Sequence, residues 1–189
     1  MQSYNIYLCG VGGQGIGLLS EILLRAADYS GYAAKAVDTH GLAQRGGTVI
    51  SQIRLGKVVF TPMIPARSAD LVVALERHEA LRGLQVALRD QGTLIYYNTV
   101  FQPLGVRLGN DIEVSAADIE AAGRQRGITV YQVARPDSPD SRMQNIAVLA
   151  EIHRRGLVPG LQAAHFLQAM EDLLAGTVLE ANLRLFHAP

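Results

Sequence analysis

The sequence has very little cysteine and no tryptophan. Cys9 is the single cysteine among 189 residues. One thiol allows no disulfide within the chain, no zinc site made of cysteines alone and no iron–sulfur cluster held by this chain alone. No histidine or other base stands near Cys9 in the sequence, so we interpret it as a small core residue rather than a nucleophile.

Net charge and long hydrophobic runs are missing as well. The chain carries 17 basic and 17 acidic side chains, so it lacks the electrostatic footprint of a nucleic-acid-binding protein. No stretch approaches the ~20 apolar residues of a membrane span, and no basic region precedes the first apolar run. We therefore expect a cytoplasmic protein that binds neither nucleic acid nor membrane. With 49% hydrophobic residues, the chain is expected to form a single domain over residues 1–189.

The alternation of strands and helices predicts an α/β fold. Residues 4–9 form a β-favouring run that ends at glycines, residues 16–29 have apolar side chains at helical spacing, and residues 33–38 resemble a second strand. Together they form a βαβ unit with an expected right-handed crossover. Later strands are expected at 69–75, 93–98 and 128–134, and later helices at 76–89, 115–127, 141–155, 160–175 and 178–187. Ser115 and Asp118 have the spacing of a capping box.

Two β-rich runs follow the second strand. Residues 48–55 and 58–60 are separated by Gly56 and Lys57, which is typical of a hairpin. We therefore expect a mixed sheet with a β-hairpin after the second strand. The predicted architecture is a three-layer Rossmann-like domain with a helical C-terminal tail.

Three glycines follow the first strand in fingerprint spacing. Gly10, Gly12 and Gly15 read G-x-G-x-x-G between a strand and a helix. Glycines let the backbone approach a phosphate, and free amides at the helix start attract its charge. Asp38 could supply the acidic group of a dinucleotide site, or cap a loop while the glycines only form a tight turn. The fingerprint alone leaves both interpretations open.

A second polar loop follows the strand at 33–38. Residues 39–47 read THGLAQRGG, in which His40, Gln44 and Arg45 precede the pair Gly46 and Gly47. An arginine beside flexible glycines could face a carboxylate or a phosphate. The alternative is a polar loop that leads into the hairpin. The other histidines show no metal-ligand spacing, so we expect no metal site and no catalytic residue in this chain.

Four segments together resemble a known family. They are GVGGQGIG at 10–17, GLAQRGGTVISQIRLG at 41–56, ADLVVALE at 69–76 and SRMQNIAVLAEIHRRGLVP at 141–159. The combination resembles the gamma-type subunit of the 2-oxoacid:ferredoxin oxidoreductases, and the AQRGG segment is similar to the small subunit of the indolepyruvate branch. The resemblance covers nearly the whole chain.

The resemblance implies a supporting role in oxidative decarboxylation of a 2-oxoacid to an acyl-CoA, with electrons passing to ferredoxin. It implies that thiamine diphosphate, Mg²⁺ and [4Fe–4S] clusters are held by a large partner subunit, with coenzyme A as co-substrate. Two large and two small chains are expected. The isolated chain would be inactive and could form a homodimer through its docking surface.

The resemblance also implies positions for the site. Gly12, Gly13, Gln14 and Gly15 would form a loop facing the partner's cofactor region, and Arg45, Gly46 and Gly47 would form a second loop beside it. Gln14 and Arg45 are hypothesised to bind or position substrate or CoA, with His40 and Gln44 nearby. Two alternatives remain open: an independent NAD(P)- or flavin-binding oxidoreductase, and a scaffold subunit that only stabilises its partner.

Overall fold

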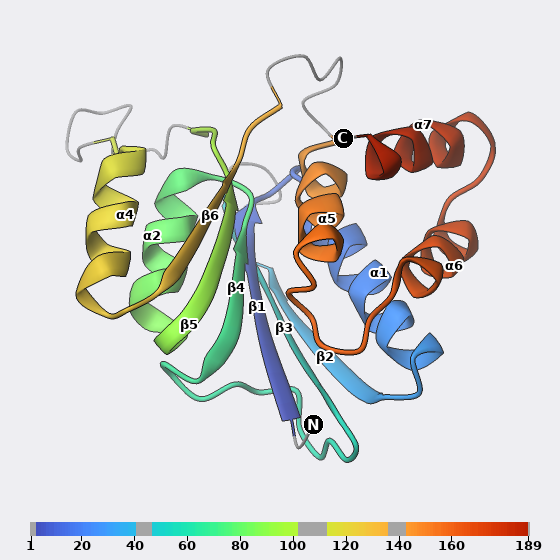
Figure 1. Cartoon of the computed structure of the whole chain (residues 1–189), viewed down its shortest axis with the longest axis horizontal. Helices are drawn as coiled ribbons and strands as arrows, with labels where there is room; N and C mark the ends of the chain where they lie inside the picture. The colour runs from blue at the N-terminus through green and yellow to red at the C-terminus, as the bar shows by residue number, and fades with distance from the viewer. Residues whose placement is uncertain (1–2, 41–46, 102–112, 136–142, 189) are drawn as a thin grey trace.

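A six-stranded sheet forms the centre of the molecule. The computed structural model describes residues 3–40, 47–101, 113–135 and 143–188. The strands are β1 (Ser3–Val11), β2 (Ala33–His40), β3 (Thr48–Gly56), β4 (Ala69–Ala74), β5 (Leu88–Tyr97) and β6 (Thr129–Val133). Their order is β2-β3-β1-β4-β5-β6 (Figure 1). β3 runs antiparallel to both of its neighbours, while β1, β4, β5 and β6 are parallel, so the predicted mixed sheet is confirmed.

Helices cover both faces of this sheet, as the α/β prediction requires. One layer consists of α1 (Ile16–Tyr29), α5 (Gln144–Arg154), α6 (Ala163–Leu173) and α7 (Gly176–His187), and the other of α2 (Arg77–Val86) and α4 (Ala116–Gln125) (Figure 1). β1 therefore has an apolar layer on each side. Ile6 and Leu8 belong to one core, and Tyr7 and Cys9 to the other. Burial on both faces explains why this strand is a continuous apolar run.

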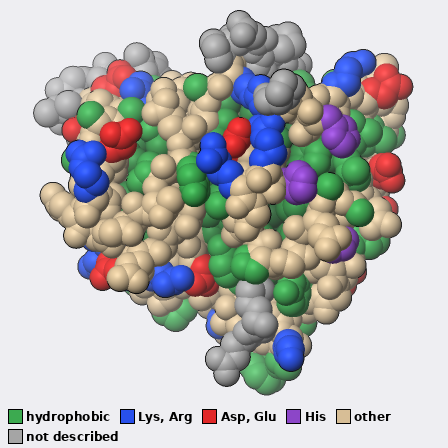
Figure 2. All heavy atoms as spheres, viewed as in Figure 1, with side chains coloured by type: hydrophobic (Ala, Val, Ile, Leu, Met, Phe, Trp, Pro, Cys, Tyr) green, Lys and Arg blue, Asp and Glu red, His purple; other side chains and the backbone are tan. Residues whose placement is uncertain are grey.

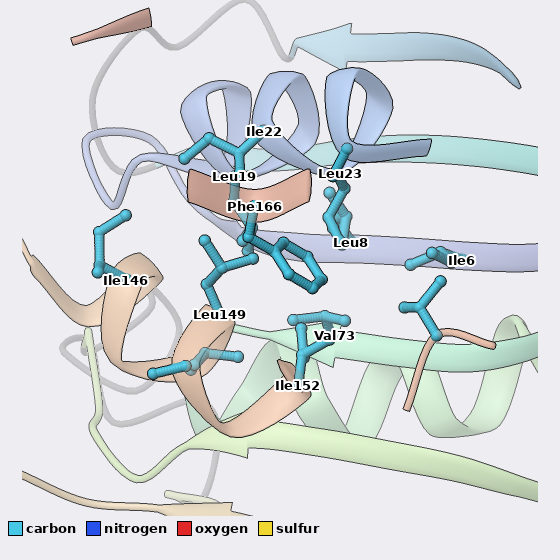
Figure 3. Close-up of a cluster of buried hydrophobic side chains, with 14 of the residues drawn as sticks. Ile6, Leu8, Leu19, Ile22, Leu23, Val73, Ile146, Leu149, Ile152 and Phe166 are labelled. Atoms are coloured by element: carbon cyan, nitrogen blue, oxygen red, sulfur yellow. The ribbon is translucent and has the colours of Figure 1, made fainter. Parts of the chain in front are cut away.

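The larger core lies between the sheet and α1, α5 and α6. Leu8 of β1 meets Leu19 and Leu23 of α1, Leu149 of α5 and Phe166 of α6 (Figure 3). Each such buried side chain contributes about 1.5–3 kcal/mol relative to exposure. The three C-terminal helices are confirmed, and they are held to the sheet by this core. None of the described helices has the length and apolar character that crossing a membrane requires.

The predicted hairpin is wrong in its second arm, because residues 58–60 do not form a strand. β3 pairs instead with β1 along one edge and with β2 along the other. Both rows of its backbone groups are occupied, so no edge is left for a further strand. The position of β3 also changes the predicted βαβ unit. β1 and β2 are parallel, as predicted, but β3 lies between them.

One predicted helix ends earlier in the structure, and another is confirmed. The helix predicted at 76–89 ends at Val86, since β5 begins at Leu88, which pairs with Ala69. The helix near 115–127 is confirmed as α4 with its capping box. Ser115 Oγ accepts from the Asp118 N–H at 3.2 Å, and the Asp118 carboxylate accepts from the Ser115 N–H at 2.8 Å.

Candidate functional site

The candidate site lies where β1 and β4 end. After β1 the chain enters α1 on one face of the sheet, and after β4 it enters α2 on the other face (Figure 1). Open α/β sheets bind ligands at the carboxyl ends of strands where connections diverge in this way. Because β3 is antiparallel to β1, its first residue pairs with the last residue of β1, Thr48 with Val11. The glycine loop and the start of β3 therefore meet at this edge.

The glycine loop is shaped by two residues in the left-handed region. Gly13 has φ +99° and Gly15 has φ +83°. A Cβ on Gly13 would meet nothing within 4 Å, so this exposed backbone is open to close approach. Gly15 is the N-cap of α1 and provides no side-chain cap. The partial positive charge at a helix start favours an anion beside this loop.

The two predicted loops are joined by a backbone hydrogen bond. The Gly12 N–H donates to the carbonyl oxygen of Gly47 at 2.9 Å. The structure thus brings the glycine loop beside the end of the second loop, as expected for Gly12 and Gly47. Gln44, Arg45 and Gly46 lie outside the described residues. His40 is the last residue of β2, with β3 between it and β1.

Gln14 closes the gap between the ends of β1 and β4. Its side chain is 3% exposed. The Oε1 atom accepts from the Val11 N–H at 2.7 Å, and Nε2 donates to the Leu75 carbonyl at 2.8 Å and to Gln144 Oε1 at 3.1 Å. Both amide hydrogens are therefore engaged within the chain. Gln14 is a positioning residue for the loop.

Two residues of α5 complete the support of this loop. Asn145 is 3% exposed, and its Nδ2 donates to the Gly15 carbonyl at 3.3 Å. Gln144 accepts from Gln14. Sequence reasoning assigned neither residue to the site, because both read as the polar first turn of a helix far along the chain. The signal was their place in the SRMQN segment that carried the family resemblance.

Buried carboxylates support the other side of the site. Glu76 follows β4, is fully buried and caps α2 by accepting from the His78 N–H at 3.0 Å. Burial raises the pKa of Glu76. Glu79 accepts from Thr48 Oγ at 3.0 Å and from Arg82 Nε at 3.0 Å. Glu79 thus fixes the residue that follows Gly47.

Cys9 lies in the core beneath these carboxylates. It is fully buried, and its thiol donates to the Glu79 carbonyl at 3.3 Å. Burial raises the pKa of the thiol well above its usual value, so it stays protonated. The interpretation of Cys9 as a core residue is confirmed. In the parts of the chain that the structure describes, no three His, Cys, Asp or Glu side chains group as metal ligands.

The geometry disfavours an independent dinucleotide site. Asp38 is exposed on β2, where it pairs with Ser51 of β3. The intervening strand places it about 10 Å from β1 in the plane of the sheet, at ~4.8 Å per strand. β3 therefore separates Asp38 from the strand that carries the glycine fingerprint.

These features define a Rossmann-like α/β domain whose glycine loop is closed by the chain's own glutamine and joined to a second loop. The chain belongs to the pyruvate ferredoxin/flavodoxin oxidoreductase family, whose model matches residues 5–188. The family resemblance found in the sequence is thereby confirmed.

Relatives and solved structures agree with this membership. The chain is 32% identical to indolepyruvate oxidoreductase subunit IorB of Methanothermobacter thermautotrophicus, over 97% of this chain and 94% of that one. It shares its fold with a keto/oxoacid ferredoxin oxidoreductase gamma subunit from Geobacter sulfurreducens, at TM-score 0.64, 19% identity and coverage of 97% and 94%. A 2-oxoglutarate:ferredoxin oxidoreductase from Magnetococcus marinus matches at TM-score 0.68 and 17% identity, over 98% of this chain and 30% of that chain.

Proposed function

We propose that this chain is the small subunit of an oxidoreductase that converts indolepyruvate, or a related aryl 2-oxoacid, to its acyl-CoA while reducing ferredoxin. The observation that carries the proposal is the 32% identity to IorB, which extends over 97% of this chain and 94% of that subunit. The likeness is therefore to a whole subunit rather than to one motif within it.

The cofactors of the reaction belong, in this proposal, to a large partner subunit. Thiamine diphosphate with Mg²⁺ would supply the chemistry of decarboxylation there, and [4Fe–4S] clusters would carry the electrons to ferredoxin. The residues of this chain do not fit a cluster, because the one cysteine is buried and donates to a backbone carbonyl. Two large and two small chains would form the assembly, in the cytoplasm. The small subunit would be a single domain over residues 1–189.

The two joined loops would complete the active assembly. Gly12, Gly13 and Gly15 offer backbone at the start of α1, where an anionic group is favoured. Gln14 supports this loop through its hydrogen bonds, and the bond from Gly12 to Gly47 fixes the last residue of the second loop beside it. In the second loop, Arg45 would bind a CoA phosphate or the 2-oxoacid carboxylate. Gln44 and Gly46 flank it in the sequence, and His40 precedes it by five residues.

Reconstitution tests the proposal. The chain is produced together with the large chain of the same source, and reduction of ferredoxin is followed with indolepyruvate and CoA. Activity in the complex that neither chain shows alone is expected, with indolepyruvate or another aryl 2-oxoacid preferred over pyruvate. Tight binding of NADH or NADPH by the isolated chain, without any assembly, would contradict it.

Arg45→Ala in this complex separates binding from scaffolding. The KM for CoA or for the oxoacid should rise about tenfold or more, as expected for loss of a hydrogen bond to a charged group. Arg124→Ala is the control, because that side chain is 72% exposed on α4. Normal kinetics with weakened assembly would instead indicate a scaffold role.

A further inference from the structure

The segment at 57–66 covers a part of the sheet on which no described helix packs on this face. On this face α2 and α4 pack against β1, β4, β5 and β6. Over β2 and β3 the covering is the connection from β3 to β4, which contains Pro62 and Pro65 and forms neither helix nor strand. Its Ile64 packs against the second core. The segment therefore takes the place of a helix over this corner.

Side chains of β2 and β3 hold the backbone of the segment in place. Gln52 Oε1 accepts from the Ile64 N–H at 2.7 Å, and Arg54 Nη1 donates to the Met63 carbonyl at 3.4 Å. Lys35 Nζ donates to the Phe60 carbonyl at 3.3 Å. A connection held at three points presents its outward side chains in a defined arrangement, which lowers the entropy cost of binding.

Those outward side chains are large and apolar. Phe60 is 88% exposed, Val58 61% and Met63 56%. A cluster of this kind on a fixed segment indicates an interaction site rather than scattered surface residues. Aromatic residues and methionine are enriched in the centres of protein–protein interfaces.

Positive charges lie next to these apolar side chains. Lys35 and Lys57 are the only lysines in the chain, and both lie here together with Arg54. Among the described residues none of the three forms an ion pair with a carboxylate. In Figure 2, hydrophobic side chains and a basic side chain lie together at the lower end of the molecule. We call Val58, Phe60 and Met63 with these three cations the 57–66 surface.

We propose that the 57–66 surface docks on the larger chain of the assembly, against an apolar patch bordered by Asp and Glu. This inference rests on the proposed function, which supplies the larger chain. A second copy of this chain fits less well, because a two-fold axis through the surface would place its unpaired cations against the same cations of the partner. An acidic border on a different chain pairs them.

The docking surface lies at the end of the sheet opposite the glycine loop. Ser3 at the start of β1 pairs with Gly56 at the end of β3, just before the segment, whereas the glycine loop follows Val11. The nine residues of β1 span about 30 Å at ~3.3 Å per residue. The larger chain would therefore contact this subunit at two separate places, and changes at the 57–66 surface should weaken assembly without altering the candidate site.

Binding of the chain to the separately purified larger chain of the same source tests this. Phe60→Glu should raise the Kd roughly tenfold to a hundredfold, as expected for a central apolar contact. Lys57→Glu should raise the Kd less at high salt than at low salt. Val178→Glu is the matched control, since Val178 is 56% exposed on α7, and it should bind like wild type.

The outcomes separate the two proposals. If the wild-type chain binds the larger chain and Phe60→Glu binds with the same Kd, the proposed docking surface is wrong and the proposed function still stands. No wild-type binding at all would overturn the proposed function and with it this inference. A homodimer of the isolated chain that Phe60→Glu converts to monomer would assign the surface to a second copy and also overturn the proposal. Circular dichroism and urea unfolding check that Phe60→Glu is folded.

Discussion

The backbone N–H of Gly12 lies 2.9 Å from the carbonyl oxygen of Gly47 and donates to it. This bond extends the β1–β3 ladder one step past the pairing of Val11 with Thr48. It exists because β3 enters the sheet between β1 and β2. The glycine loop and Gly47, the last residue of the second loop, are thus tied together at this end of the sheet.

Gly15→Ala should destabilise the fold more than Gly31→Ala. Both glycines have similar positive φ values, +83° and +80°, so both substitutions carry the left-handed strain of about 1–2 kcal/mol. Only at Gly15 would the new Cβ meet another atom, Asn145 Nδ2 at 2.5 Å. We expect losses in the free energy of unfolding of about 2–4 kcal/mol for Gly15→Ala and about 1–2 for Gly31→Ala.

Urea unfolding of the two glycine variants measures that difference. Asn145 is buried, and its Oδ1 accepts from the Ile146 N–H at 2.9 Å, so it is not free to turn away from a methyl group. Equal losses in the free energy of unfolding for both variants would show that the Asn145 side chain moves away from the new methyl group without an energetic penalty.

Gln14→Ala should lower the free energy of unfolding by about 2–4 kcal/mol, because it leaves the Val11 N–H and the Leu75 carbonyl buried without their partner. Denaturant titration measures this. Gln125→Ala, at an exposed position on α4, is the control and should change stability by less than about 0.5 kcal/mol. A similarly small change for Gln14→Ala would contradict the positioning role.

Cys9 should resist thiol reagents in the folded chain. Burial raises its pKa, so thiolate is scarce, and the sulfur is not exposed. Labelling with a chromogenic disulfide should be slow in buffer and complete in urea. Cys9→Ala should leave electron transfer in the assembled enzyme unchanged. Rapid labelling without denaturant, or loss of electron transfer in the variant, would show a role that burial does not predict.

His153 should make the fold less stable in mild acid. Its ring stacks on Phe186 and is tilted against Phe166, with centroid distances of 5.4 and 5.7 Å. Burial lowers its pKa, and the positive charges of Arg154 and His187 lower it further. The unfolded chain then binds the proton more tightly than the folded chain does. Stability from this residue is therefore present above its ordinary pKa of about 6.5 and falls as pH drops below it.

Thermal unfolding at about pH 7.5 and about pH 5.5 checks this effect. His153→Phe keeps an aromatic ring and should show a smaller loss of Tm between the two pH values than wild type. His187→Gln, at an exposed position on α7, should keep most of the wild-type loss. Identical pH dependence in wild type and His153→Phe would exclude His153 as the source.

Patterns local in the sequence predicted most elements of the fold. The strand, glycine turn and helix at the amino terminus, the capping box at Ser115, and the three C-terminal helices are all present. Each depends on residues within a few positions of one another. The prediction of a strand at 58–60 was wrong because β3 already pairs with β1 on one edge and β2 on the other. The pairing with β1 joins residues far apart in the sequence.

The candidate site was only partly predictable for the same reason. The sequence indicated Gly12, Gly15 and Gly47, and the structure joins the two loops that contain them. The family resemblance of the sequence suggested that Gln14 binds or positions substrate or CoA. In the structure, the hydrogen bonds of Gln14 hold the glycine loop itself. Asn145 escaped notice because its contact with Gly15 spans most of the chain.

The sequence by itself determined the α/β class, the absence of a cysteine set for an iron–sulfur cluster, and the family, because composition and short motifs carry that information. Only the tertiary structure decided the place of β3 between β1 and β2, the closure of the glycine loop by Gln14, and the exposure of Phe60 on a fixed segment. Each of these depends on which distant strands and helices pack together, and no local pattern encodes that choice.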